Sequence, residues 1–303
     1  MLRLEGLTKR FGEEPAVDHI SMTILPGTLV ILAGADGAGK STLLKMIVGL
    51  VIKDAGEIYL DGAAIGSNYR MITSRSGYMP EKFSLYLDLS VEENLNFFAD
   101  IYGVKRQRRE ELKLRLLEKT GMSAFTKRKA GDLSGGMKQK LALSTILLSS
   151  PEMIFLDEPT TGVDPLSRIE FFNIIDDLKK EGRTIVVSTP YLSEAEKGDV
   201  VVFIKKGRKI KEGSIKDLKA EFPGKLYEII PKGNIFDVWE KIQSDKDLKD
   251  DVYIRGNTIR YMQTGSKDYI SRIPAQKIKE EQVSLEDIYL YQEKSPSGEG
   301  DRL

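Results

Sequence analysis

The segment from residue 34 to residue 42 constrains the fold most, because it reads Gly-Ala-Asp-Gly-Ala-Gly-Lys-Ser-Thr. It fits the phosphate-loop pattern G-x-x-x-x-G-K-[ST], with Gly34, Gly39, Lys40 and Ser41 at the fixed positions. An apolar run comes directly before the segment, and a helical pattern comes directly after it. This order of strand, loop and helix is the context that the motif requires.

The chemistry of such a loop is anion binding. Glycines let backbone N–H groups curl around a phosphate, and the following helix N-terminus adds positive partial charge. Lys40 would reach the β- and γ-phosphates, and the Ser41 hydroxyl would ligate Mg²⁺. The expected nucleotide-binding residues of the loop are Gly34, Ala35, Asp36, Gly37, Ala38, Gly39, Lys40, Ser41 and Thr42. The alternative is a glycine-rich turn without a ligand, and the flanking strand and helix argue against it.

A second pattern, Met-Ile-Phe-Leu-Asp-Glu at residues 153–158, complements the loop. Four apolar residues place Asp157 at the end of a central strand, beside the phosphate loop, where it can hold the water shell of Mg²⁺. Glu158 follows directly and is the candidate general base for an attacking water. The alternative is an ordinary buried strand that ends in a polar turn.

Strands and helices alternate along the middle of the chain. Short apolar runs at residues 29–33, 153–156 and 184–188 predict buried strands, and residues 166–180 predict a helix. This alternation predicts an α/β fold with a mostly parallel sheet.

The segments around this sheet give further local predictions. Residues 1–31 alternate apolar and polar, which predicts short strands and hairpins, and residues 54–62 predict a strand that ends in a turn. Ser90 and Glu93 form a capping-box pattern at a helix start. The charged residues 106–119 predict an amphipathic helix with a solvated face.

The sequence changes character beyond about residue 220, which predicts a second, smaller domain at residues 221–303. We expect Trp239 to lie in its core and residues 295–300 to be disordered. The predicted elements are a strand at 225–230, a helix at 236–242, a hairpin turning at Gly256 and Asn257, and a capped helix at 284–290.

Composition excludes several classes of function. Lys plus Arg and Asp plus Glu number 46 each among 303 residues, so no global charge favours nucleic acid. Cysteine is absent, which rules out disulfides, a thiol nucleophile and cysteine-bound metals. No signal-peptide pattern opens the chain, and no stretch approaches 18 uninterrupted apolar residues, so we expect any membrane role to depend on a partner.

A third pattern, Leu-Ser-Gly-Gly-Met-Lys-Gln at residues 133–139, opens an apolar helical run. With this motif after a phosphate loop, the chain resembles the ATP-binding subunit of an ABC transporter over roughly residues 1–220. The resemblance implies a phosphate-loop NTPase with a mostly parallel central sheet and an antiparallel β subdomain. It also implies an α-helical signature subdomain at about residues 82–148 and a small α+β accessory domain at the C-terminus.

The resemblance also implies roles for residues outside the phosphate loop. Phe11, which by itself is as typical of a core aromatic, matches the aromatic that stacks on adenine. Asp164 lies in the Val-Asp-Pro loop that contacts the second cassette of a dimer. Two cassettes would meet head to tail, with ATP between the phosphate loop of one and the signature residues of the other. These signature residues are Ser134, Gly135, Gly136 and Met137, the last of which stands where the family usually has Gln.

Finer features are similar to one branch of the family. Residues 77–86 and 133–141 look like exporters of the multidrug and polysaccharide type. Residues 284–289 are similar to the accessory tail that those subunits carry.

Glu81 is a departure from the family pattern, which has Gln at this position to contact Mg²⁺ and the attacking water. Glu81 can still offer an oxygen to Mg²⁺. When ionised it has no donor, and it adds negative charge near the phosphates. The sequence leaves open whether this replacement is tolerated.

Pro190 is the sharper departure, because the family has a His there that donates to the γ-phosphate and the lytic water. No shift of alignment restores it, since the only histidine is His19, before the phosphate loop. Proline offers neither a side-chain donor nor an N–H. Loss of one such donor typically costs about 2.7–4 kcal/mol of transition-state stabilisation. We therefore expect good ATP binding and slow turnover at this chain's own site.

The leading functional hypothesis is an ATP-hydrolysing subunit that drives a membrane exporter, with ATP and Mg²⁺ as cofactors. Its expected partners are a second cassette, identical or different, and integral membrane permease subunits. Its expected place is the cytoplasmic side of the membrane, as a peripheral subunit. One alternative is a mainly ATP-binding regulatory half of a heterodimer. Another, a soluble ABC protein of translation or DNA repair, is disfavoured by the single cassette and the neutral charge.

Overall fold

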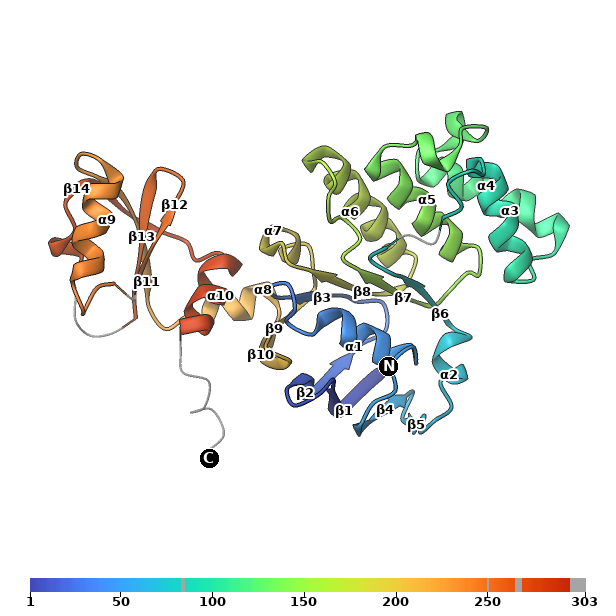
Figure 1. The fold of residues 1–303 in the computed structure, drawn as a ribbon, viewed down its shortest axis with the longest axis horizontal. Coiled ribbons are helices and arrows are strands. Elements are labelled where there is room, and N and C mark those ends of the chain that lie inside the picture. The colour runs from blue at the N-terminus through green and yellow to red at the C-terminus, as the bar shows by residue number, and fades with distance from the viewer. Residues whose placement is uncertain (83–84, 250, 265–268, 295–303) are drawn as a thin grey trace. The chain divides into compact units, whose positions relative to one another are not determined.

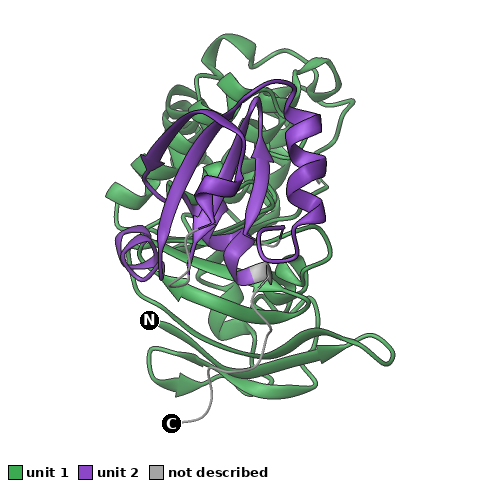
Figure 2. Ribbon diagram, turned by 90° about the vertical axis from the view of Figure 1, so that its left-hand side faces the viewer, with its two compact units in different colours: residues 1–214 green, residues 215–303 purple. Residues whose placement is uncertain are grey.

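The computed structural model describes residues 1–82, 85–249, 251–264 and 269–294. The chain forms two compact units, Met1–Ser214 and Ile215–Leu303, shown in two colours in Figure 2. The division falls six residues before the predicted one, because helix α8 (Ile215–Ala220) packs against helix α10 (Leu285–Lys294) of the second unit.

The first unit is built on a six-stranded sheet of order β10-β9-β3-β8-β7-β6 (Figure 1). All neighbouring strands are parallel except β9 and β10, so the predicted mostly parallel sheet is confirmed. Strands β3 and β7 are buried at every residue, as expected for strands covered on both faces. The strands are β3 (Leu29–Ala33), β6 (Ser76–Met79), β7 (Met153–Asp157), β8 (Thr184–Thr189), β9 (Val200–Lys205) and β10 (Arg208–Gly213).

A second, antiparallel sheet of order β2-β1-β4-β5 completes one side of this unit. The predicted short strands before residue 31 are two long ones, since one hairpin extends nearly from the N-terminus to Ile24. Helix α1 lies between the two sheets in Figure 1, and its Leu44 and Ile47 share one apolar core with Leu4 and Phe155. The elements are β1 (Leu2–Arg10), β2 (Pro15–Ile24), β4 (Ala55–Leu60), β5 (Ala63–Ala64) and α1 (Lys40–Ile47).

Helices cover the other face of the parallel sheet and extend beyond it (Figure 1). The capping box is confirmed: Ser90 Oγ accepts from the N–H of Glu93, and the Glu93 carboxylate accepts from the N–H of Ser90. No helix among the described residues is both long and apolar enough to cross a membrane. The helices are α2 (Arg70–Thr73), α3 (Val91–Ile101), α4 (Arg106–Lys119), α5 (Gly135–Leu147), α6 (Pro165–Lys180) and α7 (Leu192–Ala195), with 3-10 turns at Ser123–Phe125 and Ala130–Asp132.

The second unit contains a four-stranded antiparallel sheet of order β12-β13-β11-β14. Its own apolar core includes Ile229, Val238 and Tyr261, and Trp239 packs against that core as predicted. The predicted tail at residues 295–300 lies outside the described residues. The elements are β11 (Lys225–Pro231), α9 (Ile235–Ser244), β12 (Val252–Arg255), β13 (Thr258–Gln263), the 3-10 turn Ile270–Arg272 and β14 (Ala275–Glu281), followed by α10.

Candidate functional site

The phosphate loop joins the end of β3 to the start of α1. Gly39 occupies the N-cap of α1 with φ +104°, and no side chain caps the helix, so its first-turn N–H groups have no side-chain acceptor. A side chain at Gly39 would meet the carbonyl oxygen of Ala16 at 2.2 Å, and one at Gly34 would meet that of Ile204 at 2.2 Å. Backbone from β2 and β9 therefore packs directly on the loop, which requires glycine at both positions.

The side chain of Lys40 forms hydrogen bonds with backbone carbonyl groups of this loop. Its ammonium donates to the carbonyl oxygens of Gly34 at 2.9 Å and Ala35 at 3.0 Å. It also lies 3.2 Å from the Glu158 carboxylate, and only 2% of the lysine side chain is exposed. A buried cation under open N–H groups is a binding arrangement for an anion such as phosphate.

Asp157 lies at the carboxyl end of β7, is fully buried, and accepts hydrogen bonds from three hydroxyl groups. Ser41 Oγ and Ser188 Oγ each donate to its Oδ1 at 2.7 Å, and the Tyr78 hydroxyl donates to its Oδ2 at 3.1 Å. Burial, followed by the charge of Asp157, raises the pKa of Tyr78, which keeps the phenol a donor. The carboxylate is thus oriented by side chains from the loop helix and from both neighbouring strands.

Glu158 follows in a left-handed backbone conformation, with φ +47°. Its N–H donates to the hydroxyl and carbonyl oxygens of Ser188, at 2.9 Å and 3.2 Å, which fixes this turn. One carboxylate oxygen faces Lys40 and the other accepts from Thr161 Oγ1 at 3.2 Å. The side chain is 12% exposed, so a partly accessible carboxylate sits beside the loop cation.

These groups fit the ligands that the sequence predicts. Lys40 and the open N-terminus of α1 supply donors for an anion. The hydroxyl of Ser41 and the carboxylate of Asp157, already 2.7 Å apart, supply the hard oxygen atoms that Mg²⁺ prefers.

Two other residues predicted to bind the nucleotide or Mg²⁺ lie outside this cluster. Phe11 is 62% exposed, with Lys9 Nζ 5.5 Å from the ring centroid, so its ring has a free face to stack on a base. Glu81 is exposed in the loop after β6, and its charge contributes to the raised pKa of Tyr78.

The signature residues form the N-terminus of α5. Ser134 is the N-cap, and its Oγ accepts from the N–H of Met137 at 3.3 Å. Asp164 caps the adjacent helix α6 by accepting from the N–H of Ser167 at 2.9 Å. Hydrogen bonds from the side chain and then the backbone of Ser167 lower the pKa of Asp164. Among the described residues, Ser134 and Met137 make no hydrogen bond with the phosphate loop of the same chain. The signature residues thus form a helix N-terminus that is separate from that of the phosphate loop.

Pro190 directly follows β8, which lies beside β3 and β7 at the site. It is partly buried and brings no side-chain donor to this position. The slow turnover that the sequence analysis expects from this replacement stays a prediction.

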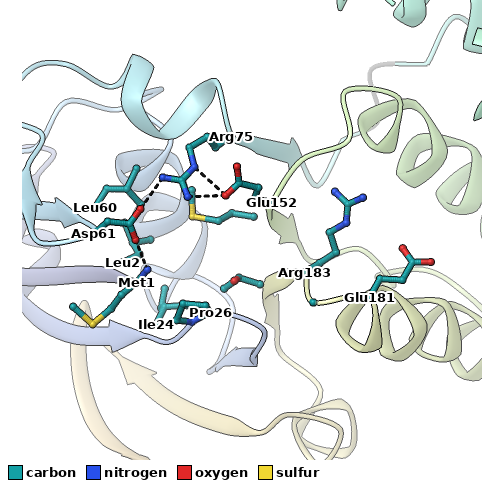
Figure 3. A pocket seen from close by; sticks show the side chains of 13 residues that line it. Met1, Leu2, Ile24, Pro26, Leu60, Asp61, Arg75, Glu152, Glu181 and Arg183 are labelled. Atoms are coloured by element: carbon teal, nitrogen blue, oxygen red, sulfur yellow. Dashed lines mark hydrogen bonds and ion pairs between the residues drawn. The ribbon is translucent and has the colours of Figure 1, made fainter. Parts of the chain in front are cut away.

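A pocket of about 360 Å³ lies elsewhere, at the amino ends of the parallel strands (Figure 3). In that view Arg75 lies between Asp61 and Glu152, and its guanidinium pairs with them at 2.7 Å and 2.6 Å. Ligands of open α/β sheets bind at the carboxyl ends of the strands. This pocket is therefore not part of the candidate nucleotide site.

Comparison with known proteins gives concordant matches. A family model described as "ABC transporter" matches residues 17–161. The "Probable multidrug ABC transporter ATP-binding protein YbhF" of Escherichia coli (strain K12) is 42% identical over 229 residues, which is 75% of this chain and 40% of that protein. The "Nod factor export ATP-binding protein I" of Burkholderia lata is 40% identical over 210 residues, 69% of each chain. The chain thus spans about two fifths of the length of the first relative.

Solved structures match a similar share of the chain. One is titled "Structure of ATP binding subunit of ABC transporter", with a TM-score of 0.65 and 29% identity over 73% of this chain and 93% of that one. Another is the dimeric post-hydrolysis state of the ATP-binding cassette MJ0796 bound to ADP and Pi. Its TM-score is 0.63 and its identity 26%, over 71% of this chain and 98% of that one.

Proposed function

Because the chain belongs to the family of ABC transporter ATP-binding subunits, we propose that it binds and hydrolyses ATP to power a membrane exporter. The observation that carries the proposal is the cluster of Lys40, Ser41, Asp157 and Glu158 at the carboxyl ends of β3 and β7. This cluster joins an anion-binding loop, an Mg²⁺-type oxygen pair and a candidate base within hydrogen-bond distances.

Each residue of the cluster has a part in this function. Lys40 and the N-terminus of α1 bind the phosphates, and Ser41 and Asp157 hold Mg²⁺, which when bound offsets phosphate charge. Glu158 accepts the proton of the attacking water at its carboxylate. Lys40 lies 3.2 Å from that carboxylate in the present arrangement. Phosphate binding must draw the ammonium away, and this frees Glu158 to act as a base.

A second cassette completes the site from the other side. Ser134 Oγ accepts a hydrogen bond from Met137, which leaves its own hydroxyl hydrogen free to donate to a phosphate of the partner's ATP. The N–H groups of Gly135 and Gly136 open the same helix end. The dimeric cassette titled as bound to ADP and Pi supports this arrangement.

The remaining partners follow from the relatives. Their printed names describe a multidrug transporter and Nod factor export, so we assign this chain to an exporter whose permease subunits select the substrate. It would act on the cytoplasmic side of the membrane, as a peripheral subunit, with Phe11 stacked on adenine. These names favour an exporter subunit over a mainly ATP-binding regulatory half.

The test compares nucleotide binding and hydrolysis in the purified chain. Glu158→Gln is expected to retain binding of a fluorescent ATP analogue, to lose at least 99% of Mg²⁺-dependent turnover, and to form an ATP-dependent dimer in size-exclusion chromatography. Glu152→Gln is the matched control, because this exposed carboxylate lies just before the same strand, at its opposite end. Absence of ATP binding, or turnover unaffected by Glu158→Gln, would disprove the proposal.

A further inference from the structure

A buried carboxylate, Glu194 on helix α7, lies just beyond the site and has no part in the chemistry described so far. Only 5% of the residue is exposed. Its Oε1 accepts from Thr160 Oγ1 at 2.6 Å, and its Oε2 accepts from Thr189 Oγ1 at 2.5 Å. Both threonines are about 1% exposed, so these two hydrogen bonds join polar groups that are buried from water.

Arg168 on α6 extends this cluster. Its Nη1 lies 3.9 Å from Glu194 Oε1, and its guanidinium lies 3.9 Å from the ring centroid of Tyr191. Its Nε donates to the carbonyl oxygen of Val163 at 2.8 Å. The N–H of Tyr191 in turn donates to Thr189 Oγ1 at 3.0 Å. We call these residues, Glu194, Thr160, Thr189, Arg168 and Tyr191, the Glu194 clamp.

The clamp joins two loops that border the candidate site. Thr160 lies two residues after Glu158, and Val163 directly precedes Asp164. Thr189 directly precedes Pro190, at the end of β8. The loop that carries Glu158 and Asp164 is therefore tied to the loop that carries Pro190.

Burial of a carboxylate is unfavourable unless its hydrogen bonds are satisfied. Here both oxygens are engaged by hydroxyl groups from the two loops, with a guanidinium nearby. Since hydrogen bonds to a charged group are stronger and more directional than neutral ones, the arrangement fixes the relative position of the loops.

We propose that Glu194 is a positioning residue, which holds the Glu158–Asp164 loop so that contact of Asp164 with the second cassette is transmitted to Glu158. This inference rests on the proposed ATPase function. Thr189 meets the phosphate loop through its backbone, where its carbonyl oxygen accepts from the N–H of Gly34 at 3.3 Å. The side-chain contacts described for the clamp lie in the two other loops, so we expect variants of these side chains to change turnover and not ATP binding.

The decisive pair of variants is Thr160→Val and Thr160→Ser. Valine keeps the shape of the buried side chain but removes the donor to Glu194, whereas serine keeps that donor. We expect Thr160→Val to lower kcat at least tenfold with ATP affinity within twofold of wild type, and Thr160→Ser to retain most of the turnover. Glu194→Gln should behave as Thr160→Val does, and Glu196→Gln, an exposed residue two positions on, is the control.

Hydrogen exchange measured by mass spectrometry supplies a readout that does not depend on turnover. In Thr160→Val, the amides of residues 160–164, 189, 191 and 192 should exchange faster, while those of β3 and β7 should keep their protection. A parallel loss of ATP affinity and kcat, or wild-type kcat in both Thr160→Val and Glu194→Gln, would overturn the inference. A wild-type protein without ATPase activity would instead refute the proposed function, and unchanged exchange in these segments would refute the clamp.

Discussion

At the scale of the residue, the orientation of the Asp157 carboxylate depends on three hydroxyl groups that have different expected roles. Ser41 is the hydroxyl that would move to Mg²⁺, whereas Ser188 and Tyr78 can only orient the carboxylate. Groups of this second kind fix the direction of a metal-binding oxygen, and their loss typically weakens metal affinity about 10–100-fold.

Tyr78→Phe tests this orienting role. The ring remains, but the donor 3.1 Å from Asp157 Oδ2 is lost. The Mg²⁺ concentration needed for half-maximal ATPase activity should rise about tenfold or more, with the thermal unfolding midpoint little changed. A Mg²⁺ titration of wild type and variant measures this, and identical half-saturation would contradict the prediction.

Pro190→His tests the missing donor. A histidine at this position could donate to the γ-phosphate, so turnover should rise, at most by about 10²–10³-fold, while ATP affinity stays within a few-fold. Steady-state ATPase kinetics and ATP binding give the two numbers. If wild type is already fast and the variant is no faster, another group replaces the donor.

Several of these residue contacts could not be predicted from the sequence. The phosphate-loop motif predicted the positions of Lys40 and Ser41 through its fixed spacing. The apolar pattern at residues 153–158 predicted Asp157 at the end of a strand beside that loop. Ser188 reaches Asp157 only because the parallel register sets these two residues side by side. That register depends on the strand order of the sheet, which no local pattern encodes.

At the scale of the element, helices α5 and α6 pack together through a glycine. A Cβ atom on Gly136 would lie 2.6 Å from both Cβ and Oγ of Ser167. The N–H of Ser167 donates to the carboxylate of Asp164, the N-cap of α6. Gly136 therefore permits close contact between helix α5, which begins at the signature residues, and helix α6, which begins after Asp164. The capping pattern of α3 was predictable because it is local, whereas this contact between helices was not.

Gly136→Ala should destabilise the first unit by about 1–3 kcal/mol, because a neighbour must move to admit the methyl group. Gly135→Ala is the matched control, since its nearest atoms would be 3.8 Å away and alanine favours a helix. Denaturant unfolding of the two variants gives the comparison. Equal stability would show that the helices adjust without cost.

At the scale of the whole molecule, each unit contains its own apolar core. The core around α1 uses residues up to Ile204, and the core of the second unit uses residues from Ile229 to Ile273. The change in sequence character near residue 220 indicated two domains. The exact division was not predictable, because it depends on the packing of α8 against α10.

A fragment of residues 1–214 should therefore fold and bind ATP with an affinity within about twofold of the full chain. The reason is that all residues of its core and of the phosphate loop lie within it. Circular dichroism and titration with a fluorescent ATP analogue would measure both properties. A fragment that is unfolded or fails to bind would show that the second unit is required for the first.

The ion pair between Lys40 and Glu158 also bears on the end of a catalytic cycle. The Lys40 ammonium lies 3.2 Å from the Glu158 carboxylate, so we expect this carboxylate to compete with the product phosphates for the same cation. A carboxylate that pairs with Lys40 as phosphate leaves would spare the protein an isolated buried charge. We therefore expect the pair to favour emptying of the site and to keep the resting subunit ready for a new nucleotide.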